Sequence, residues 1–234
     1  MSVKSLKQYL EYLKFSGIQD IFVLKNEQGG KQVAVDPGQR EQIRKENAEI
    51  LAKRSMEISQ CTNCELCAGR IKLVYGQGNP DAKMMLIGEG PGAEENKTGQ
   101  VFVGRAGQLL TKMLKAINLE REEVYIANIV KCRPPGNRDP KPQERQACMP
   151  YLLEQIDIIK PQIILLLGKV ASNTILNNQI SLGRMREQTF TFRDIPTYVS
   201  YHPSALLRNP NWKRPAWEDL KKVRDHYFAL PPKQ

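Results

Sequence analysis

PQIILLLG, residues 161–168, is the stretch that decides the fold. Five consecutive apolar residues, 163–167, stand between Gln162 and Gly168, and no polar residue alternates with them. A short, wholly apolar run of this kind is typical of a strand buried on both faces, as at the centre of a parallel sheet. Three other segments supply strand material: KMMLIG (83–88), EVYIANIV (123–130) and FTFRDIPTYVSY (190–201). The sequence therefore predicts a sheet with a deeply buried centre.

Helical patterns separate these strands. Apolar residues recur at helical spacing in four segments: 104–117, 143–159, 169–176 and 211–230. Pro150 is expected to bend or divide the second of them. The alternation predicts an α/β fold, a three-layer α/β/α sandwich around a mostly parallel sheet. Since ligands bind at the carboxyl ends of parallel strands, the loops after Gly88, Val130 and Tyr201 are expected to lie together.

The first sixty residues have a different character. We expect one helix in 5–15, a turn-rich or hairpin segment around Gly29 and Gly30, and a strongly charged helix in 39–58. This pattern predicts an N-terminal helical extension, 1–60, that packs on the main domain, 61–234, or on a partner.

The charge balance favours a polyanionic partner. Lys and Arg number 35 against 25 Asp and Glu, which gives a net charge of +10 and a pI near 9.4. Cationic side chains gain by releasing counterions from phosphates, although a basic but inert surface is the alternative. The sequence contains no apolar run long enough to span a membrane and no secretory signal, so a cytoplasmic protein is expected.

The glycine-rich loop GEGPGAEENKTGQVFVG, 88–104, follows the first buried strand. It matches neither G-x-G-x-x-G nor a P-loop, and its three glutamates would repel a pyrophosphate. Acidic hydrogen-bond acceptors, close backbone approach at the glycines and the flat ring of Phe102 suit a planar, uncharged ligand such as a nucleobase. The alternative is that the glutamates are solvated and Phe102 belongs to the core.

Two other strand ends carry polar residues that suit the same ligand. The carboxamide of Asn128 matches the imide edge of uracil, unless the backbone satisfies it. An imidazole N–H of His202 would stabilise negative charge on a departing base, unless His202 is a packed structural residue. His226, the second histidine, is interpreted as structural. Leu206 or Leu207, beside Arg208, would act as an apolar wedge next to a phosphate contact.

Five cysteines in a chain without a secretory signal need an explanation other than structural disulfides. They are Cys61, Cys64, Cys67, Cys132 and Cys148. C-x-x-C pairs bind metals, so four of these thiolates would hold zinc or an iron–sulfur cluster, and the spacing does not choose between them. The alternative is that the cysteines are unrelated buried thiols.

These motifs together resemble family 4 uracil-DNA glycosylases, the iron–sulfur class. The resemblance rests on CELC (64–67), GEGPGAEENKTGQVFVGRAGQLL (88–110), IANIVKCRPPGNRDP (126–140) and HPSALLRNP (202–210), and covers the chain from Cys61 onward. It implies the α/β/α sandwich of this superfamily around a short four-stranded sheet. It further implies hydrolysis of the N-glycosidic bond of deoxyuridine in DNA, as base excision repair requires, in a protein active at the nucleoid.

The resemblance also implies roles for individual residues. Gly88, Glu89 and Gly90 would form the pocket wall, Phe102 would stack on uracil, Asn128 would read its edge and His202 would stabilise the departing base. Glu95 or Glu89 would orient the water. Cys64, Cys67, Cys132 and Cys148 would ligate a structural [4Fe–4S] cluster, with Cys61 surplus or exchanging with Cys64 or Cys67. Arg208, Arg133 and Arg138 are the expected phosphate contacts, and Leu206 or Leu207 the wedge.

The motifs depart from the family pattern at three positions. Asn96, Val101 and Ser204 stand where Asp, Pro and Ala are usual, and Asn96 removes an acid. An Arg-rich, histidine-bearing insertion that a related group uses to bind uracil covalently does not follow Phe102. We therefore expect a monomer that turns over on single- or double-stranded DNA. The alternatives are a module that binds uracil without cleavage and a nucleotide-dependent oxidoreductase.

Overall fold

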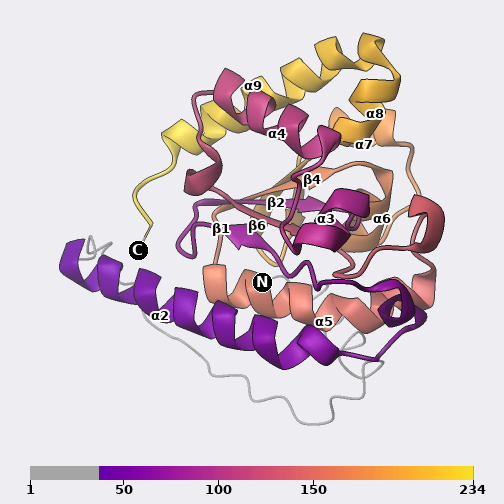
Figure 1. Cartoon of the computed structure of the whole chain (residues 1–234). Coiled ribbons are helices and arrows are strands. Elements are labelled where there is room, and N and C mark those ends of the chain that lie inside the picture. Colours follow the sequence, from indigo (N-terminus) through magenta and orange to yellow (C-terminus); the bar gives the residue numbers. More distant parts are fainter. Residues whose placement is uncertain (1–36, 234) are drawn as a thin grey trace. The chain divides into compact units, whose positions relative to one another are not determined.

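The computed structural model describes residues 37–233, which form a mixed α/β fold with a sheet of six strands (Figure 1). The strand order is β1-β3-β2-β4-β6-β5. The four inner strands, β3 (Tyr125–Asn128), β2 (Met84–Gly88), β4 (Ile163–Leu167) and β6 (Ile195–Ser200), run parallel to one another. The expected helix in 5–15 and the hairpin around Gly29 lie outside the described residues.

The sheet of four strands that the resemblance implied is wrong, because two short antiparallel strands extend it. β1 (Gln77–Gly78) pairs with β3, and β5 (Phe190–Phe192) pairs with β6. β5 and β6 form a hairpin whose two-residue turn, Arg193 and Asp194, has positive φ at both residues, the geometry of a tight hairpin turn. Strands of two or three residues are too short to show a periodic pattern.

β4 lies in the interior of the sheet, between β2 and β6, as its apolar sequence predicts. All five of its residues are fully buried. Helices cover the two faces of the sheet: α4 (Arg105–Ala116) and α9 (Lys213–Ala229) lie on one side, and α5 (Pro142–Ile159) and α2 (Pro37–Glu57) on the other (Figure 1). α6 (Lys169–Leu176) contacts β2 and β4.

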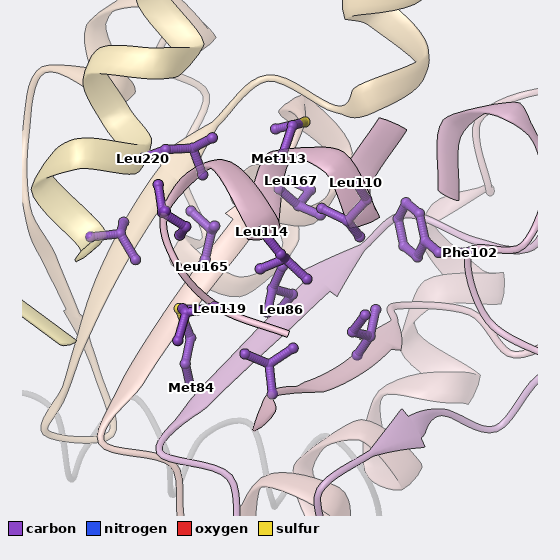
Figure 2. Packing of buried hydrophobic residues seen from close by; sticks show 14 of the residues in the cluster. Met84, Leu86, Phe102, Leu110, Met113, Leu114, Leu119, Leu165, Leu167 and Leu220 are labelled. Atoms are coloured by element: carbon purple, nitrogen blue, oxygen red, sulfur yellow. The ribbon is translucent and has the colours of Figure 1, made fainter. Parts of the chain in front are cut away.

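One hydrophobic cluster joins the sheet to α4 and α9. Figure 2 shows Leu86 of β2 below Leu114 of α4, with Leu165 of β4 beside Leu114 and Leu220 of α9 above them to the left. Phe102, from the glycine-rich loop, lies at the edge of this cluster (Figure 2). The core therefore supports one side of the loop on which the predicted base pocket depends.

Several smaller elements complete the described fold. They are α3 (Ala93–Thr98), α7 (Leu182–Arg186), α8 (Pro203–Arg208) and five 3₁₀ turns, η1 (Ile58–Gln60), η2 (Glu65–Gly69), η3 (Arg121–Glu123), η4 (Pro135–Asn137) and η5 (Pro210–Trp212). Pro150 does not divide the helix that contains it, since α5 runs unbroken over 18 residues. None of the helices in residues 37–233 is long and apolar enough to cross a membrane.

α2 packs along α5 and is tied to it by charge. Arg54 Nε lies 2.6 Å from Glu154 of α5, and Arg40 Nε lies 2.8 Å from the carboxylate of Asp81, just before β2. The charged helix expected in 39–58 is thus confirmed. The division of the chain at residue 60 stays a prediction.

Candidate active site

A cleft of about 670 Å³ opens at the carboxyl ends of the parallel strands. The loop after β2 contributes Glu89 and Gly90, β3 contributes Asn128, the end of β4 leads into Gly168, and His202 follows β6. The expected convergence of these strand ends is confirmed. The cleft lies in the size range of ligand-binding pockets and is open enough for more than one ring.

Glu95 organises the glycine-rich loop from within. Its Oε1 accepts hydrogen bonds from the backbone N–H groups of Val103 and Gly104, both at 2.9 Å, and its Oε2 accepts one from Gly92 at 3.1 Å. These bonds close the loop at the start of α3, a helix that the sequence analysis treated as loop. The carboxylate lines the cleft but is 8% exposed, so holding the loop is its evident structural work.

Asn96 ties the same loop to the cysteine-rich segment. Its Oδ1 accepts a hydrogen bond from Ile71 N at 3.0 Å, and its Nδ2 donates one to Gly69 O at 3.1 Å. An Asp here would lack the donor for the second bond. The departure from the family pattern at this position therefore has a structural use.

Gly88, Asn128 and Phe102 meet at the floor of the cleft. A Cβ on Gly88 would lie 2.5 Å from Asn128 Oδ1 and 2.7 Å from Phe102 Cζ, so a larger residue would fill this space. Gly88 itself is buried beneath the floor and does not line the cleft, whereas the other two residues do. Phe102 has a φ of +51°, an unusual backbone conformation for a bulky residue, and Arg121 donates hydrogen bonds to the carbonyls of Phe102 and Val101. The ring is held in place by its strained loop.

Asn128 carries a buried polar atom without a partner. Its side-chain Oδ1 is buried and finds no hydrogen-bond donor among residues 37–233. Such an atom is costly to bury, and among the residues that line the cleft it is the one atom of this kind, which points to a ligand that supplies the donor. No backbone group of the described residues therefore donates a hydrogen bond to this oxygen, contrary to the alternative interpretation of Asn128.

His202 is the N-cap of α8 and lies against Phe102, with ring centroids 5.4 Å apart. Ser204 N–H donates to its Nδ1 at 3.2 Å, and Ser204 Oγ lies 2.8 Å from the same nitrogen. Because a backbone N–H can only donate, Nδ1 is unprotonated and the ring proton resides on Nε2. Burial of the imidazole, with a smaller effect of the positive charge of Arg208, lowers the pKa of His202 to about 4. The imidazole is therefore neutral at physiological pH.

Glu89 is an acid of the cleft lining whose pKa is raised. It is half-buried, and burial, with a smaller effect of the nearby Asp139 carboxylate, raises its pKa to about 7. Arg145 and Arg208 oppose this shift. A carboxyl group with a pKa near neutrality is suited to take a proton from water.

The predicted DNA contacts are distributed unequally. Leu206 is 2% exposed and belongs to the hydrophobic cluster, whereas Leu207 is 37% exposed. The structure thus narrows the wedge prediction to Leu207. Arg208 is exposed and lines the cleft. Arg138 also lines it.

The two arginines of the loop after β3 already have partners. Arg138 pairs with both oxygens of the buried Glu144, at 2.6 and 2.8 Å. Arg133 lies outside the cleft lining and donates through Nε to Asn137 Oδ1 at 2.8 Å. A phosphate contact by either residue would use the N–H groups that remain.

Sequence reasoning missed several residues of the cleft, among them Gly168, Lys169, Tyr201 and Trp212. Gly168 has a φ of +90°, and a Cβ there would lie 2.8 Å from His202 Cβ, so glycine allows the histidine to approach β4. A glycine directly after a buried strand was a signal available in PQIILLLG. For Trp212, far along the chain, no local pattern pointed to the cleft.

All five cysteines line a second cavity, together with Tyr151 and Lys131. Within residues 37–233, no three Cys, His, Asp or Glu side chains converge closely enough to form a site for a single ion. A cluster of several iron atoms separates its thiolates more widely than one ion does, so a shared cavity lined by thiols fits such a group. Burial raises the pKa of Cys64 and Cys132, and that of Cys148 to about 12, in the absence of metal.

Hydrogen bonds to sulfur distinguish the cysteines. Arg70 donates to Cys132 Sγ at 3.6 Å and Lys131 N donates to Cys148 Sγ at 3.3 Å, contacts of the kind that surround cluster thiolates. Cys61 Sγ instead lies 3.3 Å from the hydroxyl of Tyr151. This contact of Cys61 with Tyr151 is compatible with its expected role as the surplus cysteine, which does not ligate the cluster.

Lys131 lines the cysteine cavity and is hydrogen-bonded to Asn128, a residue of the cleft. Its ammonium group is fully buried, donates to Asn128 O at 3.0 Å and bonds to Gln155 Oε1. Its own backbone N–H reaches Cys148, as described above. The hydrogen bonds of Lys131 therefore fix the segment that carries Asn128 relative to Cys148.

Comparisons with known proteins agree with this geometry. A family model described as the uracil DNA glycosylase superfamily matches residues 75–221. A type-4 uracil-DNA glycosylase of Sulfurisphaera tokodaii is 44% identical over 195 residues, covering 80% of this chain and 88% of that protein. One of Thermotoga maritima is 43% identical over 188 residues, covering 77% and 95%. A type-5 uracil-DNA glycosylase of Pyrobaculum aerophilum is 31% identical over 163 residues, covering 62% and 71%.

Proposed function

The chain belongs to the uracil DNA glycosylase superfamily and excises uracil from DNA in DNA repair, and from this premise we propose how its cleft performs the reaction. The observation that carries the proposal is the buried, unpartnered Oδ1 of Asn128 beside Phe102 and a neutral His202. Asn128 and His202 come from the ends of β3 and β6 and Phe102 from the loop between α3 and α4, and together the three side chains suit one extruded pyrimidine.

The base is selected by hydrogen bonding at the floor of the cleft. Phe102 stacks on the extruded uracil, Asn128 Oδ1 accepts from its N3–H, and Asn128 Nδ2 donates to its O4. Cytosine presents an unprotonated N3 and an amino group, the opposite pattern, and leaves both amide atoms wrongly paired. Gly90 lines the wall without a side chain, and Gly88 beneath the floor leaves space for Asn128 and Phe102.

His202 stabilises the leaving group. As the N-glycosidic bond breaks, its electron pair moves onto the uracil ring, and Nε2–H of the neutral imidazole donates to O2. Ser204 holds the other ring nitrogen, which fixes the tautomer that this donation needs. A neutral donor lowers the energy of the uracil anion without having to protonate it.

Glu89 is the acid that we assign to the water. Its pKa of about 7 lets the carboxylate accept a proton from the water that attacks C1′, and its charge offsets cationic character on the sugar. Both carboxylate oxygens of Glu95 accept hydrogen bonds from backbone N–H groups of the loop, three in all. We therefore assign Glu95 to positioning Phe102. The products are free uracil and an abasic site.

The surface around the cleft grips the strand. Leu207 fills the space that the extruded nucleotide leaves, at an unstacking cost of roughly a few kcal/mol. Arg208 contacts a neighbouring phosphate, and Arg133 and Arg138 approach the backbone from the opposite loop. The protein acts as a monomer on single- and double-stranded DNA.

Cys64, Cys67, Cys132 and Cys148 are the residues that we propose to hold a [4Fe–4S] cluster, with Cys61 outside the set. When bound, the cluster cross-links two segments that are distant in sequence, 61–69 and 131–148. Lys131 bonds to Cys148 through its backbone N–H and to Asn128 through its ammonium group. Asn96 joins Ile71, shortly after Cys67, to the glycine-rich loop. The cysteines would therefore support both sides of the cleft through these bonds.

The test uses oligonucleotides that carry a single uracil or a thymine at the same position, followed by alkaline cleavage. We expect strand breaks only at uracil, with more than one uracil released per protein molecule. Stable binding without abasic sites at high protein concentration would instead indicate a module that recognises uracil without cleaving it.

A further inference from the structure

An exposed aromatic ring stands in the cleft lining. Trp212 belongs to the short turn η5 between α8 and α9, is 39% exposed, and lines the same cleft as Asn128 and His202. Large aromatic rings are normally buried, so an accessible one within a nucleic-acid-binding cleft is a candidate contact for a base.

The ring is part of a rigid stack. Trp212 packs on Tyr201 with centroids 4.9 Å apart and planes 14° from parallel, and the guanidinium of Arg186 lies 4.3 Å from the centre of the Tyr201 ring. Tyr201 thus packs against both groups, and its ring and the indole of Trp212 are held nearly parallel. Trp212, which is exposed, is the outer layer of this stack.

Buried ion pairing anchors the inner end of this stack. Arg186 bonds to both oxygens of Asp219, at 2.7 and 2.9 Å, and to Pro215 O at 2.7 Å. Asp219 also accepts a hydrogen bond from Ser200 Oγ at 2.7 Å. Because the stack is already ordered, a base that binds to it loses little further side-chain entropy in the protein.

Exposed cationic residues occur next to Trp212 in the chain and in the cleft lining. Lys213 and Arg214 are exposed and follow Trp212 directly, and Arg208 and Lys169 line the cleft with it. An aromatic platform beside cations is the arrangement with which proteins bind single-stranded nucleic acid. The acids of the cleft, Glu89, Glu95 and Asp139, come from the segments after β2 and β3 and not from the segment that carries Trp212.

The platform is separate from the uracil pocket but held at a fixed offset from it. Tyr201 precedes His202 in the chain, so the inner ring of the stack and the leaving-group residue share one backbone segment. Phe102 already supplies the surface on which uracil stacks. The cleft of about 670 Å³ leaves room for a second ring.

We propose that the outer face of Trp212 binds a second nucleobase, the one adjacent to the extruded uridine on the same strand. This inference rests on the proposed function. A base that stacks on Trp212 must leave its neighbours, which costs less in single-stranded DNA than in a duplex. The platform therefore favours excision from unpaired strands.

The test compares Trp212→Ala with the wild-type protein on single-stranded oligonucleotides under single-turnover conditions. One set has ordinary bases around the uracil, and two others have an abasic residue on its 5′ or its 3′ side. We expect Trp212→Ala to raise the half-saturating protein concentration roughly 5- to 150-fold, the range for loss of one base–aromatic stack. Trp212→Phe should restore most of the affinity, and on duplex DNA the effect of Trp212→Ala should be smaller.

The abasic substrates identify the occupant. On one side of the uracil, loss of the base should weaken binding by the wild-type protein as much as Trp212→Ala does, and should have no further effect on that variant. Phe228→Ala is the matched control, because Phe228 is an exposed aromatic of α9 outside the cleft lining, and it should bind like the wild type. Unchanged affinity in Trp212→Ala, or multiplicative effects of the variant and the abasic residue, would overturn the proposal.

A second readout does not depend on excision. The chain has two tryptophans, so Trp217→Phe leaves Trp212 as the sole indole fluorophore. A single-stranded oligonucleotide containing thymine and no uracil should quench this fluorescence, and one made wholly of abasic residues should not. Equal quenching by the two would contradict base stacking. If the protein bound and quenched with bases but released no uracil, the proposed function would fail and the platform would stand.

Discussion

His202 is neutral in the cleft because the surrounding atoms exclude water and Ser204 N–H occupies its Nδ1. We predict that His202→Ala slows uracil excision roughly 10²-fold or more, the effect of losing one hydrogen-bond donor to a developing anion. Single-turnover rates on a uracil-containing oligonucleotide measure this loss. An unchanged rate would remove His202 from the mechanism.

Glu89 supplies a pH dependence. Its raised pKa means that the carboxyl is largely protonated below about pH 7 and is a carboxylate above it. If the carboxylate takes the proton from water, single-turnover excision should rise about tenfold per pH unit below 7 and level off above it. His202 does not contribute an inflection there, because its pKa of about 4 keeps it neutral throughout.

The matched variant is Glu89→Gln. It should be slower than the wild type and should lose the inflection near pH 7. The same pH profile in Glu89→Gln as in the wild-type protein would assign the titration to another group, and Glu95→Gln would then be the variant to compare.

Asn128 is expected to lower the stability of the free protein while it enables recognition of uracil. Because its buried Oδ1 has no donor within residues 37–233, Asn128→Leu should leave the free energy of unfolding unchanged or raise it by about 1 kcal/mol while it abolishes uracil selection. Asn96→Leu is the control, since that buried amide has hydrogen-bond partners at both ends and its loss should cost about 1–3 kcal/mol. Thermal or denaturant unfolding of the two variants separates these outcomes. Equal destabilisation of the two proteins would show that Asn128 is satisfied in the native state.

At the scale of elements, the glycine-rich loop is a structure built around one carboxylate. Glu95 accepts hydrogen bonds from three backbone N–H groups, so Glu95→Gln replaces an acceptor with a donor that faces a donor. We predict a loss of about 2 kcal/mol in the free energy of unfolding, together with weaker substrate binding, because the backbone that carries Phe102 shifts.

Glu94→Gln provides the control for this prediction. Glu94 is exposed and pairs with Lys97 on the surface of α3, so its loss should change stability by less than about 0.5 kcal/mol. If Glu95→Gln were as stable as Glu94→Gln but inactive, Glu95 would act on the reaction directly and not through the loop.

The elements differ in how far the sequence predicted them. β4 has an unbroken apolar run and α4 a strong helical periodicity, and their bounds lie within two residues of those expected. α3 was missed because five of its six residues are polar and its fold depends on the Glu95 contacts. β1 was missed, and the strand material in 190–201 was not divided into β5 and β6, because the pairing of these short strands with β3 and with each other is decided across the sheet.

At the scale of the whole molecule, the cysteine cavity joins segments that are more than sixty residues apart in the chain. We predict that Cys148→Ser loses the iron and its brown colour and unfolds at a lower temperature, because one cross-link between 61–69 and 131–148 is removed. Cys61→Ser is the matched control and should retain the iron. Metal analysis and visible absorbance check both variants, and a colourless wild-type protein with stoichiometric zinc would contradict the cluster.

The amino-acid pattern alone determined the α/β fold, the loop that forms the cleft, and the strand ends at which Asn128 and His202 stand. These features follow from local apolar periodicity and from the rule that parallel strands present their carboxyl ends together. Only the tertiary structure decided that Leu206 is core while Leu207 is exposed, that Glu95 braces the loop while Glu89 titrates, and that Trp212 reaches the cleft. Burial, hydrogen-bond partners and pKa depend on neighbours that folding brings from distant parts of the chain, and no local pattern encodes them.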